Sequence, residues 1–255
     1  MSAMPTLSAE KIQELAARLF NMVAEKDGKD PRADIKKVKL ILVEAGDQAV
    51  DVVNTKDNKG KTLLHVNPNL EVAKLLVQHG ANIDAKNRRG YTALHFAASY
   101  NLIHIAKFLI EEGADVSARS DNGNTPLHFT ETPIIAQLLM QYGADVTAKN
   151  DKNETPLHLT NNCEVADILI QHGADVNAKA NNGETAFNLA VQNGKYAIAE
   201  FLQAHSNHIK EKTKISPSEK SDDTQKISWA NRHAKRDKSS SPEPSKRIKT
   251  GHLGI

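Results

Sequence analysis

Cysteine is nearly absent from this chain, with one cysteine among 255 residues. A single cysteine excludes an internal disulfide framework, and this composition suits a reducing compartment. Aromatic residues are also scarce, at 4%. No apolar run approaches the roughly 20 residues needed to cross a bilayer, and the N-terminal segment mixes charged with apolar side chains, unlike a secretory signal. We therefore expect a protein of the cytoplasm, the nucleus or both, with no membrane partner.

The motifs of common enzymes are missing as well. The sequence has no Cys-x-x-Cys and no pair of histidines spaced as zinc ligands around a glutamate, so no zinc site is indicated. It also has no phosphate-binding glycine loop and no Gly-x-Ser-x-Gly. We therefore expect no catalytic activity, no metal and no cofactor.

The sequence does contain two short motifs that recur at a regular spacing. Five related tetrads, two of which read Thr-Pro-Leu-His, begin at threonines spaced by 30, 33, 30 and 30 residues. These threonines are Thr62, Thr92, Thr125, Thr155 and Thr185. Gly-Ala-Asp-Val begins at Gly113, Gly143 and Gly173, with a softer copy at Gly80. Self-similarity at such a period is the signature of a stacked-repeat protein.

Each repeat predicts the same small unit. The threonine can cap a first helix, and proline follows it at Pro126 and Pro156, where no backbone N–H is needed. A second helix with a constant alanine comes next, and the glycine of the Gly-Ala-Asp-Val phrase ends it. A later turn carries Gly60, Gly90, Gly123 and Gly183. Asn153 takes this place in the fourth repeat, and asparagine is the residue other than glycine best suited to positive φ.

Together these motifs are similar to those of ankyrin repeats. The resemblance covers residues 58–207 and implies an all-α solenoid of stacked helix pairs with β-hairpin loops. The repeats are expected at residues 58–86, 87–119, 120–149, 150–179 and 180–207. In this family the histidine of the tetrad resembles a structural residue that hydrogen-bonds neighbouring loop backbone. The resemblance therefore makes His65, His95, His128 and His158 structural residues and not metal ligands.

Three of the repeats are shortened to 30 residues and lack three residues between the threonine and the second helix. Three residues are close to one turn of an α-helix. We therefore expect the first helix of these repeats to be little more than one turn long. Asn69, Thr132 and Asn162 would then cap the second helices.

Residues 1–57 predict a helical cap at the N-terminal end. Apolar residues recur at three- and four-residue steps, which predicts a helical hairpin over residues 7–46. Residues 39–46 of this hairpin echo residues 74–80 of the first repeat. We interpret the hairpin as a diverged repeat that covers the apolar side of the first true repeat. An unrelated helical prefix is the alternative.

Residues 208–255 predict a disordered basic tail. From Ile209 to Ile255, nine Lys and three Arg stand against six Asp and Glu, giving +6, so the rest of this +2 chain carries −4. The isolated apolar residues of the tail cannot form a core. Its basic clusters resemble a nuclear-localisation signal that importin would read, with a solvated charged tail as the alternative. The import candidates are Lys235, Arg236, Lys246, Arg247 and Lys249. Ser216 and Ser241 precede prolines and resemble phosphorylation sites.

Recognition is the function that remains, and the turns where the repeats differ should carry it. The first two turns are basic and the later ones are polar or acidic. Arg88, Arg89, Tyr91 and Tyr100 are the best anchor candidates, since Arg and Tyr dominate interface hot spots. The other candidates are Asn122, Asn124, Lys152, Glu154 and Glu184. We expect a monomeric adaptor or inhibitor that binds a protein through the hairpin edge and the concave face.

Two alternatives stay open. In the first, the tail binds nucleic acid or an acidic surface and the repeats serve as a scaffold. Nucleic acid is the weaker of these partners, because Trp229 is the tail's only aromatic residue that could stack on a base. In the second, the protein is an effector of an intracellular bacterium and acts on a protein inside a host cell.

Overall fold

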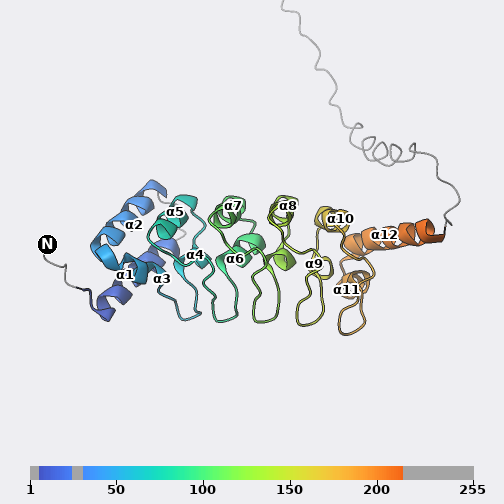
Figure 1. Cartoon of the computed structure of the whole chain (residues 1–255), viewed down its shortest axis with the longest axis horizontal. Helices are drawn as coiled ribbons and strands as arrows, with labels where there is room; N and C mark the ends of the chain where they lie inside the picture. Colours follow the sequence, from blue (N-terminus) through green and yellow to red (C-terminus); the bar gives the residue numbers. More distant parts are fainter. Residues whose placement is uncertain (1–5, 25–30, 215–255) are drawn as a thin grey trace, which may run out of the picture. The chain divides into compact units, whose positions relative to one another are not determined.

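The computed structural model describes the backbone of residues 6–24 and 31–214 and the side chains of residues 6–22 and 35–207. Within these ranges the chain is helical and no residue belongs to a strand (Figure 1). The all-α solenoid of stacked helix pairs is therefore confirmed. The loops expected as β-hairpins are tight turns without a strand ladder.

The repeats form two layers of helices within residues 58–214. The first helices are α4 (Leu63–Val66), α6 (Ala93–Ser99), η2 (Pro126–Phe129), α9 (Pro156–Leu159) and α11 (Ala186–Gln192). The second helices are α5 (Leu70–Gln78), α7 (Ile103–Glu111), α8 (Pro133–Gln141), α10 (Cys163–Gln171) and α12 (Tyr196–Lys214). Consecutive first helices contact one another, and α5, α7, α8 and α10 do the same in the second layer. The hydrophobic core lies between the layers.

The shortened repeats have shortened first helices, as expected. The helices α4, η2 and α9 have 4 residues each, whereas α6 and α11 of the full-length repeats have 7. Asn69 and Asn162 cap the second helices, because each side chain accepts two backbone N–H groups. Thr132 also occupies the predicted N-cap position, of α8, but its side chain accepts no N–H there. Its hydroxyl instead donates to Asn101 Oδ1 at 2.8 Å.

The second helices are held by a buried set of small and branched residues. In α8, Ile135, Ala136 and Leu139 are completely buried, and α10 repeats this pattern with Val165, Ala166 and Leu169. The alanine between the larger residues lets neighbouring helices approach closely. The second helices of all five repeats bury the same pattern of residues.

The N-terminal cap has one helix more than the predicted hairpin. After α1 (Ala9–Ala24) and α2 (Pro31–Ala45), the chain forms a short 3-10 turn, Gly46–Gln48, and then α3 (Ala49–Asn54). Helix α1 contacts α4, and α2 contacts α5, so the cap extends both helical layers. This arrangement supports the interpretation as a diverged repeat, and the domain boundary at residue 57 stays a prediction.

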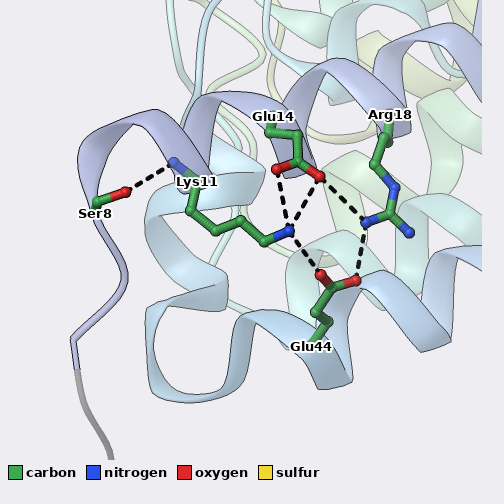
Figure 2. Close-up of polar contacts among 5 residues, drawn as sticks. All are labelled: Ser8, Lys11, Glu14, Arg18 and Glu44. Carbon is green, nitrogen blue, oxygen red and sulfur yellow. Dashed lines mark hydrogen bonds and ion pairs between the residues drawn. The ribbon is translucent and has the colours of Figure 1, made fainter.

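Four charged side chains join α1 to α2 (Figure 2). Lys11 Nζ lies 3.0 Å from oxygens of both Glu14 and Glu44, and Arg18 Nη1 lies 2.9 Å from Glu44 Oε2. Hydrogen bonds from Lys11 and Arg18 lower the pKa of Glu44, and the bond with Glu44 raises the pKa of Lys11. These side chains are at least one-third exposed, so solvent screens the network and it orients the hairpin more than it stabilises it.

The last helix departs from the predicted boundary. Helix α12 continues to Lys214, so the boundary expected between residues 207 and 208 falls inside a helix. The expected disorder beyond this helix lies outside the described residues. The five repeat boundaries remain predictions.

Candidate functional site

The candidate site is built on five turns that share one backbone geometry. In the turn at residues 87–91, the Asn87 N–H donates to the Tyr91 carbonyl at 3.0 Å, and Asn87 Oδ1 accepts from the N–H groups of Arg89 and Tyr91. Asp57 and Asn150 do the same in their own turns. Asn153 adopts φ of 60° where the other turns have glycine, which confirms the prediction made for it.

Backbone hydrogen bonds also tie each turn to the next. The Arg88 N–H donates to the Lys59 carbonyl at 3.1 Å, and the Asp121 N–H donates to the Arg89 carbonyl at 3.0 Å. Equivalent bonds run from residue 151 to 122 and from 181 to 152. The turns therefore form one connected edge along the stack (Figure 1). Side chains on this edge sit on a backbone that is already ordered.

Two glycines let the first three turns approach closely. Gly60 has φ of 74°, and a Cβ there would lie 2.8 Å from the Arg88 backbone nitrogen. Gly90 has φ of 73°, and a Cβ there would lie 2.5 Å from the Asp121 nitrogen. Both the positive φ and the close contact require glycine at these positions.

A groove of about 510 Å³ lies where these turns meet the first helices. The strongest candidates from the sequence, Arg88, Arg89, Tyr91 and Tyr100, all line it. The remaining lining residues are Asn58, Lys59, Lys61, Asn87, His95, Phe96, Ser99 and Phe129. Its volume lies within the range of roughly 300–1,000 Å³ that is typical of ligand pockets. The groove brings together residues of the first three repeats.

Four aromatic rings make up the apolar part of the groove. The Tyr91 ring meets Phe129 edge-on at 5.5 Å and Phe96 at 6.2 Å, and Tyr100 stacks on Phe96 at 6.1 Å. The chain has only one Trp, four Tyr and six Phe, so four of its eleven aromatic residues converge here. Such clustering in an aromatic-poor chain marks this surface as different from the rest of the stack.

Four cations make up the charged part of the groove. Lys59, Arg88 and Arg89 are exposed, and Lys61 is half-buried. Lys61 Nζ lies 4.6 Å from the centre of the Phe96 ring, a distance suited to a cation–π contact. Among the described side chains, none of the four cations forms an ion pair with a carboxylate. No Asp or Glu lines the groove.

Sequence reasoning missed Phe96, Phe129, Lys59 and Lys61. The two phenylalanines directly follow the histidine of the repeated tetrad, where the other repeats have Val66, Leu159 and Leu189. This departure from an aliphatic pattern could have identified them. Lys59 and Lys61 were visible only as part of a basic turn.

The candidates in the later repeats do not line this groove. Asn124 is only 9% exposed, and its Oδ1 accepts from Asn150 Nδ2 at 2.8 Å. Its assignment to a partner-binding surface was wrong, because this hydrogen bond uses the side chain inside the stack. Glu154 is half-buried and accepts from the same Asn150 amide. Glu184 is half-buried and accepts from Gln192 Nε2 at 3.0 Å. Asn122 and Lys152 are exposed.

The repeated histidines stabilise the edge beneath the groove. Nε2 of His65, His95 and His128 donates to the carbonyls of Tyr91, Asn124 and Glu154, while Nδ1 accepts from the threonine N–H of the same repeat. The structural role expected for these three residues is therefore confirmed. His158 keeps the bond to its threonine, but its buried Nε2 has no partner in hydrogen-bonding geometry.

Burial lowers the pKa of all four histidines. For His95 and His128 the pKa falls from 6.5 to about 4, although the carbonyl that each ring bonds partly offsets the burial. The neutral ring is the form that these sites require, because Nδ1 must accept a hydrogen bond while Nε2 donates one.

Other kinds of site find little support in the described part of the chain. There, no three His, Cys, Asp or Glu side chains are grouped so that they could hold a metal ion. No helix among the described residues is both long and apolar enough to cross a membrane. The import candidates, Lys235, Arg236, Lys246, Arg247 and Lys249, lie outside the described residues, as do Ser216 and Ser241.

Comparison with known proteins identifies the class. A family profile described as ankyrin repeats in three copies matches residues 29–120, 66–150 and 130–213. These matches together cover more than half of the 255 residues, and the chain belongs to the ankyrin repeat family. Membership implies interaction with other proteins, and proteins of this family are generally non-enzymatic interaction modules.

Among curated proteins, the chain is similar to Notch-regulated ankyrin repeat-containing protein A of Danio rerio and to the Notch-regulated ankyrin repeat-containing protein of Homo sapiens. Each is 49% identical over 49 residues. The alignments cover 18% of this chain and 44% and 43% of the two relatives. The chain therefore spans less than half the length of the curated relatives that it matches.

Proposed function

We propose that the protein is a non-enzymatic adaptor or inhibitor that binds another protein at the groove between its first three repeats. The observation that carries this proposal is the convergence of four aromatic rings and four cations on one connected backbone edge. Tyrosine and arginine are enriched among the residues that dominate binding energy at interfaces. The concave face and the remaining turns would add contacts of smaller effect.

The mechanism is binding to a preformed surface. The turns are fixed by hydrogen bonds within and between them, so a partner would not have to order the backbone of the groove. A smaller entropy loss leaves more of the contact energy available as affinity. A bound protein would be held in one orientation, as an adaptor or an inhibitor requires.

Affinity capture with the purified full chain tests this proposal. A protein captured from a cell extract would be identified by mass spectrometry, purified, and titrated against the wild-type chain by calorimetry. The double variant Arg88→Glu/Arg89→Glu would be titrated in parallel. We expect its affinity to fall roughly 100-fold, because charge reversal in the groove repels what the wild type attracts.

Lys152→Glu is the matched control. Lys152 is exposed and occupies the same place in its turn as Arg89, but it lies outside the groove. Its affinity should stay close to that of the wild type, and both variants should keep the helical circular-dichroism signal. Equal binding by wild type and double variant would remove the groove from the interface. An equal loss for Lys152→Glu would extend the interface to the later turns.

Three finer assignments remain predictions. These are a monomeric state, import through the basic tail by importin, and modification of Ser216 and Ser241. The alternative in which the tail binds nucleic acid and the alternative of a bacterial effector also stay predictions, since neither rests on the described residues.

A further inference from the structure

We propose that the occupant of the groove is a short linear peptide segment of a partner protein, in which acidic residues flank a large apolar side chain. This inference rests on the proposed function, which requires only that the groove binds a protein. It adds the chemistry of the bound segment. Three features of the groove support it: its charge, the position of its rings and the rigidity of its backbone.

The groove is positively charged, whereas residues 1–208 as a whole carry a net negative charge. Residues 1–208 carry a net charge of −4, because the chain totals +2 and residues 209–255 carry +6. The groove is lined by two lysines and two arginines and by no acidic residue. Asp57 is the acidic residue of the first turn, and its Oδ1 accepts the N–H groups of Lys59 and Lys61. A cationic surface on an anionic body selects an anionic ligand.

The four cations of the groove come from two neighbouring turns of the edge. Lys59 and Lys61 belong to the first turn, and Arg88 and Arg89 belong to the second. The bond from the Arg88 N–H to the Lys59 carbonyl sets these two turns side by side. Such an arrangement suits several carboxylates distributed along a chain better than a single compact anion. An acidic peptide offers this distribution.

The aromatic rings require an apolar partner next to those carboxylates. Tyr100 is 67% exposed and its ring stacks on Phe96, so its open face is available in the groove. Tyr91 and Phe129 are half-buried. A leucine, phenylalanine or tryptophan of the peptide would cover Tyr100 and Phe96 and remove apolar surface from water. The flanking acidic residues would then meet the cations at the rim.

The groove needs little adjustment to receive such a segment. Gly60 and Gly90 allow neighbouring turns to approach closely because they have no Cβ. His95, which lines the groove, is held in place by its hydrogen bond to the Asn124 carbonyl at 3.0 Å. A flexible peptide loses entropy when it binds. A rigid receptor avoids a second loss of the same kind.

Selection from a phage-displayed library of short random peptides on the full chain tests this inference. We expect enriched sequences that combine several Asp or Glu with one large apolar residue. The best peptide would carry a fluorescent label, and fluorescence anisotropy would give its affinity for the wild type, for Arg88→Glu/Arg89→Glu and for Lys179→Glu, which changes an exposed lysine outside the groove. The double variant should bind ~100-fold more weakly, and Lys179→Glu should bind like the wild type.

Matched peptides separate the two chemical contributions. Replacing the acidic residues by Gln and Asn should weaken binding ~10-fold or more and remove its dependence on salt. Replacing the apolar residue by Ala should weaken binding by a similar factor without changing the salt dependence. A peptide whose affinity survives both changes would overturn the inference.

Other outcomes distinguish this inference from the proposed function. Enrichment of basic or neutral peptides at the groove would overturn the acidic chemistry and leave the protein-binding function standing. No enrichment would overturn a linear segment, while affinity capture would still test a folded partner.

The chain's own tail is the other occupant that the experiments must separate from an external peptide. Trp229 is the only tryptophan, and a change of its fluorescence in the unliganded double variant would assign the groove to the tail and overturn an external peptide.

Discussion

The turn at residues 87–91 and the turn at residues 150–154 have the same backbone and use it differently. In both, an asparagine at the first position accepts two N–H groups of its own turn. The fifth position is Tyr91 in one turn and Glu154 in the other. The Tyr91 ring packs on Phe96 and Phe129 and helps to form a groove. Glu154 instead accepts a hydrogen bond from Asn150.

The difference shows that one turn geometry can carry side chains with different structural roles. In these two turns the asparagine at the first position maintains the backbone, so the fifth position is free to differ. Tyr91 at this position lines the groove, whereas Glu154 closes a hydrogen-bond network with Asn150. Asn150 completes that network by donating also to Asn124. The first three repeats are therefore the candidates for binding, and the later repeats extend the stack.

The largest effect we expect is a loss of stability in acid. Buried histidines of the repeated tetrad occur in the repeats of both regions, and burial lowers their pKa values. His95 and His128 have pKa values of about 4 in the folded chain against an ordinary value of 6.5. Between these values the unfolded chain binds more protons, so their contribution is fully present above pH 6.5 and is lost as pH falls through 4. At pH 4 the loss should be on the order of 3 kcal/mol for each histidine. Urea unfolding followed at several pH values would measure it.

The double variant His95→Asn/His128→Asn is the control for the acid experiment. Asparagine stands at the corresponding place in the last repeat, where Asn188 hydrogen-bonds Thr185. The variant should be less stable than the wild type at pH 7 and should vary less between pH 6.5 and 4. An unfolding free energy of the wild type that is constant over this pH range would contradict the assignment.

The next effect concerns the core that both regions share. Leu139 in α8 is 0% exposed, so Leu139→Ala should lower the free energy of unfolding by ~2–5 kcal/mol through lost burial and a residual cavity. Ile134 lies in the same helix but is 55% exposed. Ile134→Ala should change the free energy by less than about 0.5 kcal/mol. Urea denaturation of both variants would measure the contrast, and similar losses would mean that the α8 core does not hold the stack together.

Local rules predicted much of this fold from the sequence. The clipped first helices, the caps at Asn69 and Asn162 and the positive φ of Asn153 each follow from residues close in the chain. Helix α3 was missed because its valines are modest helix formers and the segment is held by burial against α1 and α2. Thr132 stands at the predicted N-cap but makes no side-chain capping bond, because its hydroxyl bonds Asn101 of the preceding repeat.

The groove could be predicted only in part, because it also depends on contacts between neighbouring repeats. Arg88, Arg89, Tyr91 and Tyr100 stood out by residue type within one repeat. Phe129 joins them from the next repeat, and its contact with Tyr91 depends on how the repeats stack. Asn124 looked like a surface residue in the sequence, but stacking buries it against Asn150. Contacts between repeats were therefore the information that the repeat pattern alone did not provide.

A smaller loss of stability should distinguish the turn at residues 87–91, next to the groove, from the last turn, at residues 180–184. Gly90→Ala would force a positive φ on alanine and place Cβ 2.5 Å from the Asp121 nitrogen, so it should cost about 1–3 kcal/mol. Gly183 also has positive φ, but a Cβ there would meet nothing within 4 Å. Gly183→Ala should therefore cost less, about 1 kcal/mol. Thermal unfolding would rank the two, and equal losses would show that the contact between turns adds nothing to the cost of backbone strain.

The smallest effect on stability, and the most direct test of the comparison, concerns two exposed tyrosines. Tyr100 is 67% exposed and lines the groove, whereas Tyr196 at the start of α12 is 68% exposed and lies outside it. Each tyrosine-to-alanine variant should stay within about 0.5 kcal/mol of the wild type in urea. Tyr100→Ala should weaken binding of the acidic, apolar peptide ~5-fold or more, because hot-spot residues cost more than about 1 kcal/mol when truncated. Tyr196→Ala should leave the affinity unchanged. Because exposure is matched, a common loss of affinity would show that position in the groove does not decide binding, and the distinction between the two regions would fail.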